Sequence, residues 1–381
     1  MCSCAECRFC AQAACSAFAA DYQINPVSPC TSAAPPTRAG RAADSATASM
    51  NPPQISIIIK ALNEQRRIAA CIESALVDAA ALRAEVIVVD SLSTDDTVAI
   101  ARRYPVRIVQ FARKQDIGCG AAVQMGYQFA RGRYLYVLDA DMALQRGFIA
   151  LALARLQADA GLAGVGGKVI DSQVLTASDQ RRRVAAERLT ADVEVKELGG
   201  GGLYRREAVE QTGYLGHQGL YAFEEAELGA RLRSGGWRLL RLAAPAVMHE
   251  GHAESDVTML RRLWRNGRAR AGGAVLRSAW GRPWLVQLAR KQAHLLAMPL
   301  AHVLALLAAL GLARQADERL LVWGAVWLVV ALLLALRKRS LPRGLWTLVE
   351  SHFFAVAAML GLLARPRSPH APMAGQEITS P

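Results

Sequence analysis

Two aspartates, Asp139 and Asp141, follow an apolar and aromatic run, residues 134–138, of the kind that forms a strand buried on both faces. In open α/β sheets ligands lie beyond the carboxyl ends of the strands, so we expect both side chains to face a substrate. Two carboxylates at this spacing repel each other unless a cation lies beside them. Because oxygen ligands suit Mg²⁺ or Mn²⁺, the pair predicts a divalent-metal site that can also hold a diphosphate. A polar loop after a strand is the alternative.

Two more carboxylates, Glu64 and Asp90, follow other predicted strands, residues 55–59 and 85–89. All four acids are then expected at the same edge of one sheet, where a role in solubility does not explain them. An acid after the second strand is well placed to hydrogen-bond a ribose or a base edge. The Gly-x-Gly-x-x-Gly fingerprint is missing after the first strand, which argues against a nicotinamide or flavin enzyme.

The elements that must position these acids alternate between strand and helix. Residue patterns predict a helix at residues 68–79 and a helix start at 93–96. They also predict strands at 106–109 and 165–170 and a surface helix at 180–195. Alternation at this spacing predicts an α/β domain with a doubly wound, mostly parallel sheet.

Three stretches carry a family signal: Ile55-Ser56-Ile57-Ile58-Ile59 with Asn63-Glu64, Val88-Val89-Asp90-Ser91-Leu92-Ser93-Thr94-Asp95-Asp96-Thr97, and Leu138-Asp139-Ala140-Asp141. In this order and spacing they resemble the nucleotide-sugar half of family 2 glycosyltransferases, over residues 54–260. The resemblance implies the GT-A fold. Lys60 and Asp96 depart from the usual pattern, in which proline and glycine are common at these positions.

The resemblance also implies roles for the residues at the donor end. The residues expected to bind a sugar nucleotide are Asn63, Glu64, Asp90, Ser93 and Asp139. Asp139 and Asp141 would hold Mg²⁺ or Mn²⁺ at the diphosphate. His249 is the expected third metal ligand, in preference to His252, because related enzymes often place such a group directly after a strand.

An acidic helix start after Phe223 reads Glu-Glu-x-Glu-Leu-x-x-Arg-Leu-x-x-x-Gly-Trp and ends at Trp237. It resembles the family's acidic motif, whose second residue is the catalytic base, so the resemblance assigns that role to Glu225. Glutamate stands here in place of the more common aspartate. Acids in a first helical turn also occur simply as partners of the helix dipole.

A run of four glycines, residues 199–202, precedes Leu203-Tyr204-Arg205-Arg206. In the family such a turn borders the acceptor pocket, and the residues so implied are Gly201, Gly202, Tyr204 and Glu224. Four glycines suit a place where backbone approaches a ligand closely, and a flexible linker is the alternative.

Three apolar runs near the C-terminus, residues 295–313, 320–336 and 345–364, approach the about 20 residues that cross a hydrocarbon layer of about 30 Å. Glu350 and His352 are costly inside lipid. The third run is therefore a shifted span, a re-entrant piece or a helix packed on its neighbours, and the sequence leaves these alternatives open.

A basic block precedes the apolar runs: residues 261–291 hold nine Arg or Lys and no Asp or Glu. Such a block can meet nucleic acid or an anionic bilayer. The apolar runs that follow favour the bilayer, and no nucleic-acid partner is expected. By the positive-inside rule the catalytic domain then lies on the cytoplasmic side of a multi-pass protein of the cell membrane.

The chain has 381 residues, 52% of them hydrophobic, so it can fill more than one core. The predicted parts are a disordered tail (residues 1–52), a GT-A domain (53–260) and a basic juxtamembrane segment (261–292). A membrane region of two to three helices (293–366) and a second disordered tail (367–381) follow. Six of the eight cysteines lie in the first thirty residues, where we favour disorder over a metal knot. No secretory signal pattern is present there, and a translation start at Met50 is an alternative to Met1.

Together these features predict an inverting, hexosyltransferase-type enzyme of cell-surface glycan or glycolipid biosynthesis. It would move a sugar from a nucleoside diphosphate, UDP rather than GDP, to a lipid-linked or glycan acceptor at the membrane. The alternatives are a polyprenyl-phosphate sugar synthase and a non-catalytic membrane scaffold that binds sugar nucleotides. A processive synthase fits less well, because no Gln-x-x-Arg-Trp stretch follows the acidic motif.

Overall fold

A computed structural model describes residues 52–251 and 255–378 of the chain. The cysteine-rich tail predicted at residues 1–52 lies outside these residues apart from Pro52, and so does His252. The disorder of that tail and the alternative start at Met50 therefore remain predictions.

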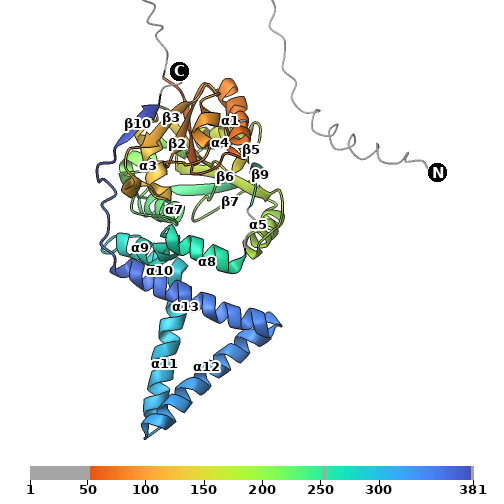
Figure 1. Cartoon of the computed structure of the whole chain (residues 1–381). Helices are drawn as coiled ribbons and strands as arrows, with labels where there is room; N and C mark the ends of the chain where they lie inside the picture. The colour runs from red at the N-terminus through yellow and green to blue at the C-terminus, as the bar shows by residue number, and fades with distance from the viewer. Residues whose placement is uncertain (1–51, 252–254, 379–381) are drawn as a thin grey trace, which may run out of the picture. The chain divides into compact units, whose positions relative to one another are not determined.

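The sheet begins with the parallel strands that the alternating pattern predicts. Four strands lie side by side in the order β3-β2-β1-β4 and all of them are parallel (Figure 1). The bounds of this part are β1 Ile55–Ala61, α1 Ile68–Leu82, β2 Ala84–Asp90, α2 Thr97–Ala101, β3 Arg107–Phe111, η1 Lys114–Asp116, α3 Cys119–Phe129 and β4 Tyr134–Asp139. The register places Lys60 of β1 beside Asp139 of β4, so the strand ends meet at one edge.

Beyond β4 the sheet is mixed. β8 pairs antiparallel with β4 and β6, β6 pairs parallel with β9, and β5 pairs antiparallel with β9. The bounds are β5 Met142–Leu144, α4 Phe148–Ala158, β6 Leu162–Asp171, α5 Ala177–Arg188, β7 Val193–Glu194, β8 Gly202–Arg205, α6 Arg206–Thr212, α7 Glu224–Ser234 and β9 Arg238–His249. The helix predicted at 180–195 ends at Arg188, because residues 193–194 pair with β9 instead.

Both faces of the central strands are buried, as their unbroken apolar runs predict. Along β1, Ile57 and Ile59 belong to one hydrophobic cluster with α1 and α4, whereas Ile58 belongs to a second cluster with α3 and α7. Successive side chains of a strand point to opposite faces, so one strand supplies both clusters. The sheet is thereby held between two layers of helices, and its strand ends are fixed in position.

The C-terminal part is helical before its last strand. Its bounds are α8 Asp256–Arg265, η2 Arg268–Arg270, α9 Ala271–Ser278, α10 Leu285–Gln292, η3 Ala293–Leu296, α11 Ala297–Leu312, α12 Ala316–Lys338 and α13 Leu341–Leu363. Three helical stretches are long and apolar enough to cross a membrane: Leu285–Leu312, Ala316–Lys338 and Leu341–Leu363. Each stretch covers one of the predicted apolar runs to within one residue at its end, and most side chains of the stretches are not buried within the chain.

The second predicted tail, residues 367–381, differs from its prediction. Residues Gly375–Ile378 form β10, which pairs antiparallel with β3 at the edge of the sheet. Arg107 supports the pairing, since its Nε lies 2.7 Å from Glu377 Oε1. An exposed edge strand such as β3 offers unpaired backbone groups to any short extended segment, and this segment is too short to give a strand pattern of its own.

Candidate active site

A cavity of about 1800 Å³ opens where β1 and β4 end. Its wall comes from the loops after these strands, the start of α7, the end of β9 and the helices that follow residue 256. The predicted site residues that line it are Asn63, Glu64, Asp139, Asp141, Glu224, Glu225 and His249. The predicted residues that are not on its wall are Asp90, Ser93, Gly201, Gly202 and Tyr204.

Lys60, which replaces the common proline, bridges two acids of the cavity. Its Nζ lies 2.8 Å from Asp139 Oδ1 and 3.1 Å from Glu224 Oε1. Burial alone would lower the pKa of Lys60, but Asp139 and Glu224 outweigh that effect and raise the pKa well above its ordinary value. Lys60 is therefore charged, and it ties the end of β4 to the start of α7.

His249, the last residue of β9, contacts two carboxylates. Its Nε2 lies 3.6 Å from Asp141 Oδ2, and its Nδ1 lies 2.8 Å from Asp171 Oδ1. Asp171 is held in turn by Arg182 of α5, whose Nη2 lies 2.7 Å from Asp171 Oδ1. Strand register creates this arrangement, because His249 lies opposite Asp171 of β6. The nearby Asp141 carboxylate is the main reason why the pKa of His249 is raised, and Asp171 adds to the effect.

These contacts fit a divalent cation held by Asp141 and His249. A carboxylate behind a ligating histidine, here Asp171, commonly orients the ring so that the other nitrogen faces the metal. Asp139 is instead held by Lys60, and within residues 52–251 and 255–378 no three His, Cys, Asp or Glu side chains converge as a metal site. The predicted ligand set of three residues is therefore not formed in this structure.

The loops after β1 and β2 are joined by hydrogen bonds beside the cavity. Asn63 has φ 57°, and its Oδ1 accepts a hydrogen bond of 2.8 Å from the backbone N–H of Thr94. Asp90 is fully buried, and its carboxylate accepts hydrogen bonds from the Ser93 backbone N–H at 3.1 Å and from Gln110 Nε2 at 2.8 Å. In this structure Asp90 and Ser93 therefore shape the loop behind the cavity wall, and Asn63 and Glu64 face the cavity.

The second helix start also differs from its prediction. α2 begins at Thr97, so the acids of residues 95–96 precede the helix and do not lie in its first turn. Asp95 Oδ1 still accepts a hydrogen bond of 3.1 Å from the Thr97 backbone N–H. The Thr97 hydroxyl in turn accepts one of 2.8 Å from the Glu64 backbone N–H, so this helix start positions Glu64.

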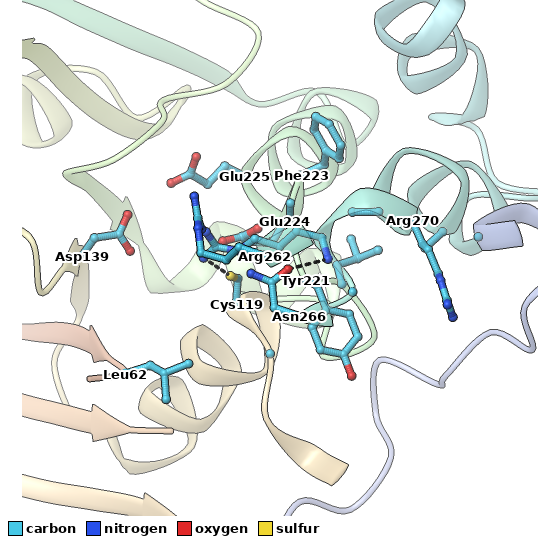
Figure 2. A pocket seen from close by; sticks show the side chains of 18 of the residues that line it. Leu62, Cys119, Asp139, Tyr221, Phe223, Glu224, Glu225, Arg262, Asn266 and Arg270 are labelled. Atoms are coloured by element: carbon cyan, nitrogen blue, oxygen red, sulfur yellow. Dashed lines mark hydrogen bonds between the residues drawn. The ribbon is translucent and has the colours of Figure 1, made fainter. Parts of the chain in front are cut away.

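Three glutamates open α7, and the structure gives each a different environment. Glu227 is buried and pairs with Arg231 at 3.0 Å, whereas Glu224 pairs with Lys60. Glu225 is half-buried and forms no ion pair with any described residue; Figure 2 shows its carboxylate on the Asp139 side of the pocket. Loss of contact with water raises the pKa of Glu225 to about 8, with Glu224 and Asp139 adding to the effect and Lys60 opposing it.

The glycine run and Tyr204 lie deeper than predicted. Gly201 has φ 80°, and a Cβ there would lie 2.7 Å from Val247 Cγ1, so the turn requires glycine for its own packing. Gly202 and Tyr204 are buried within β8. Because these residues do not reach the cavity wall, Glu224 alone of the predicted acceptor-side residues is brought to it.

Sequence reasoning missed a group of arginines that line the same cavity. They come from α8, η2, α9 and the segment after α13: Arg262, Arg265, Arg268, Arg270, Arg277, Arg365 and Arg367. Arg268 reaches the start of α3, with its Nη2 3.0 Å from Cys119 Sγ. The sequence feature that could have predicted the arginines of residues 261–291 is the basic block without acids. The charges of that block were instead expected to meet an anionic bilayer.

The α/β domain is similar in sequence to known proteins. Residues 56–213 match the family described as glycosyl transferase family 2. The chain is 34% identical over 115 residues to chondroitin synthase of Escherichia coli, which covers 30% of this chain and 17% of that protein. It is 38% identical over 101 residues to succinoglycan biosynthesis protein ExoO of Rhizobium meliloti (strain 1021), covering 24% and 28% of the two chains. The matched parts are thus less than a third of either relative.

Among solved structures, the mannosyltransferase PcManGT from Pyrobaculum calidifontis, in complex with GDP-Man and Mn²⁺, is similar over most of its length. The identity is 22%, the TM-score is 0.54, and the match covers 82% of this chain and 88% of that chain. At this identity the likeness concerns the fold. Residues 56–213 thus match the family described above, and the α/β domain has a fold of the GT-A type.

Proposed function

We propose that this chain is a membrane-associated, inverting glycosyltransferase that moves a hexose from a nucleoside diphosphate to an acceptor at the membrane surface. The carrying observation is Glu225, which lies on the cavity wall on the Asp139 side without an ion-pair partner among the described residues (Figure 2). The fold neighbour bound to GDP-Man and Mn²⁺ supports a nucleotide-sugar donor. The two polysaccharide-related relatives support a glycan or glycolipid product.

In the proposed step an acceptor hydroxyl oxygen attacks the anomeric carbon from the face opposite the diphosphate. The new bond is acceptor oxygen to anomeric carbon, and the bond that breaks joins that carbon to the diphosphate oxygen, which leaves with the electron pair. Glu225 takes the proton of the hydroxyl. Its raised pKa makes it a stronger base than an ordinary glutamate, provided that it is ionised.

Other side chains orient the donor. Asn63 and Glu64 line the donor end, and Lys60 keeps Asp139 and Glu224 in place on either side of the reacting centre. Asp141 and His249 are the residues that would hold a divalent cation, Mg²⁺ or Mn²⁺. Such a cation, when bound, neutralises charge on the diphosphate leaving group.

The fold also bears on how the chain meets a membrane. β10 follows α13 and pairs with β3 of the α/β domain, so the chain enters and leaves the helical part on the same side. An even number of crossings meets that condition. We therefore infer that α11 and α12 cross as a hairpin, with the α/β domain on the cytoplasmic side, and that α13 lies along the membrane surface. That placement leaves Glu350 and His352 of α13 outside the hydrocarbon core.

A donor screen tests the proposal. Purified full-length protein with membrane lipid extract and Mn²⁺ should release UDP from one UDP-sugar, with GDP-sugars as the alternative donors. The Asp141→Asn variant should release far less nucleoside diphosphate, and Asp192→Asn, on the surface, serves as its control. A radiolabelled donor identifies the product as a glycolipid or glycan, or as a polyprenyl-phosphate sugar. Binding of every donor without release of nucleoside diphosphate would contradict the proposal and favour a scaffold.

A further inference from the structure

Part of the cavity wall is a cluster of arginines with no carboxylate partner, which we call the arginine wall: Arg265, Arg268, Arg270, Arg277 and Arg365. In the described parts of the chain none of these five forms an ion pair. Uncompensated cations that line one cavity raise the local concentration of anions. The wall therefore points to an anionic ligand.

The arginine wall continues into an apolar surface formed by the membrane-associated helices. The apolar side chains that line the same cavity there include Ala271, Ala274, Leu295, Phe354 and Ala364. Leu295 lies within the stretch Leu285–Leu312, and Phe354 belongs to α13. A ligand that satisfies both surfaces carries a charged group next to a long apolar chain.

Glycines hold the two sides of the arginine wall at a fixed separation. A Cβ at Gly273 of α9 would lie 1.7 Å from the carbonyl oxygen of Ala358 in α13, and one at Gly361 would lie 2.1 Å from the Arg270 carbonyl oxygen. The backbones of α9 and α13 are thus in direct contact. Arg270 and Arg277, on the η2–α9 side, are thereby positioned relative to Arg365 just after α13.

The arginines divide into an inner and an outer group. Arg268 contacts Cys119, and Glu224 and Asp139 contribute to its raised pKa, so it belongs to the donor end. Arg270 lies away from Asp139 and Glu225 in Figure 2, and its guanidinium is 5.1 Å from the centre of the Trp264 ring. An anion at Arg270 is therefore separate from the donor diphosphate.

We propose that Arg270, Arg277 and Arg365 bind the phosphate or diphosphate of a lipid-linked acceptor. The lipid chain then follows the apolar surface into the membrane, and a sugar attached to the phosphate extends toward Glu225. The separation of Arg270 from Glu225 favours a sugar hydroxyl, and not the lipid phosphate itself, as the attacking group. This inference rests on the proposed transferase function and specifies the chemical class of its acceptor.

The test is a binding measurement without donor on the full-length protein in a neutral detergent. The probes are farnesyl phosphate, farnesyl diphosphate, farnesol and inorganic phosphate, measured by microscale thermophoresis. We expect the phosphorylated prenols to bind at least tenfold more tightly than farnesol, because charge-assisted hydrogen bonds are lost with the phosphate. Arg270→Gln with Arg277→Gln should weaken that binding at least tenfold. Arg290→Gln, in the same basic block but off the cavity wall, should not change it.

Arg365→Gln provides a second variant if the double variant does not fold, and thermal unfolding reports folding in each case. Equal affinity for farnesol and farnesyl phosphate, or unchanged affinity in both variants, would overturn the proposal. Competition by inorganic phosphate at the same concentration as farnesyl phosphate would assign the site to free phosphate. Equal competition by phosphatidylglycerol micelles would assign it to a bulk anionic surface. Release of nucleoside diphosphate is measured separately, so failure here leaves the proposed transferase function testable.

Discussion

The three acids at the start of α7 have different environments because of their partners. Glu227 is held by Arg231 and by the Tyr214 hydroxyl at 2.7 Å, and Glu224 is held by Lys60, which leaves Glu225 as the acid that can accept a proton. The motif resemblance predicts Glu225 from sequence alone. It does not predict Lys60, because the contact depends on how β1, β4 and α7 meet in space.

The raised pKa of Glu225 predicts the direction of the pH dependence. A carboxyl with a pKa of about 8 is mostly protonated at neutral pH, and a protonated carboxyl cannot act as a base. We expect kcat/KM for a hydroxyl acceptor to rise with pH through about 8 and to level off above that value. A pH profile between 6 and 9.5 checks this, and a flat profile in the wild type would remove Glu225 from the base role.

Removal of Lys60 should destabilise the fold. Lys60→Met leaves the Asp139 and Glu224 carboxylates without their shared cation, and breaking a buried pair in this way costs about 3 kcal/mol. Urea unfolding at pH 8 measures the change. Lys60→Met combined with Glu224→Gln should recover part of the loss, because the second change removes one of the two carboxylates left without a cation. Equal stability of Lys60→Met and wild type at pH 8 would contradict the bridge.

At the scale of elements, β6, β9 and α5 together orient the candidate metal ligand His249. Its partner Asp171 lies at the end of β6 and is held by Arg182. The sequence predicts the strand at residues 165–170, yet no local pattern marks Asp171, because only the register between β6 and β9 brings it to His249.

We expect Asp171→Asn to weaken Mn²⁺ binding about 10- to 100-fold, because the histidine ring loses the carboxylate that orients it. Electron paramagnetic resonance of free Mn²⁺ in the presence of nucleoside diphosphate measures the affinity without any turnover. Glu187→Gln, an exposed substitution on α5, should bind Mn²⁺ as the wild type does. If Asp171→Asn also binds Mn²⁺ normally, His249 is not oriented through Asp171 for a metal.

Elements with strong periodicity were predictable and weak ones were not. The buried strands β1, β2 and β4 each have an apolar run, and the helices between them have an apolar stripe. β10 has only four residues, two of them polar, and it exists because β3 offers a free edge. The mixed order of β8, β6 and β9 likewise arises from long-range pairing that no local pattern records.

At the scale of the whole molecule, the proposed membrane topology rests on the pairing of β10 with β3. Cysteines introduced at Gln315, between α11 and α12, and at Ser368, after α13, distinguish two crossings from three. In sealed right-side-out vesicles a membrane-impermeant maleimide should label Gln315→Cys, and should label Ser368→Cys only after permeabilisation. Labelling of Ser368→Cys in sealed vesicles would mean that α13 crosses the membrane and that β10 leaves the sheet.

The basic block shows how far whole-molecule features could be predicted from sequence. Its position before the apolar runs indicated a membrane-proximal role, and composition alone supports that. Its contribution to the cavity could not be predicted, because Arg268 meets Cys119 across a sequence separation of 149 residues. The motifs thus predict the acids at the ends of β1 and β4 that line the cavity, whereas its arginine-lined side could be located only from the fold.

The central claim is that Glu225 removes a proton from an acceptor hydroxyl while a nucleoside diphosphate leaves. The most direct measurement is the single-turnover rate of nucleoside diphosphate release by full-length protein reconstituted with membrane lipid extract, for wild type, Glu225→Gln and the surface control Glu210→Gln. We predict a loss of about 10²- to 10⁴-fold for Glu225→Gln, with donor affinity retained and the control unchanged. A Glu225→Gln protein that turns over at the wild-type rate would contradict the account.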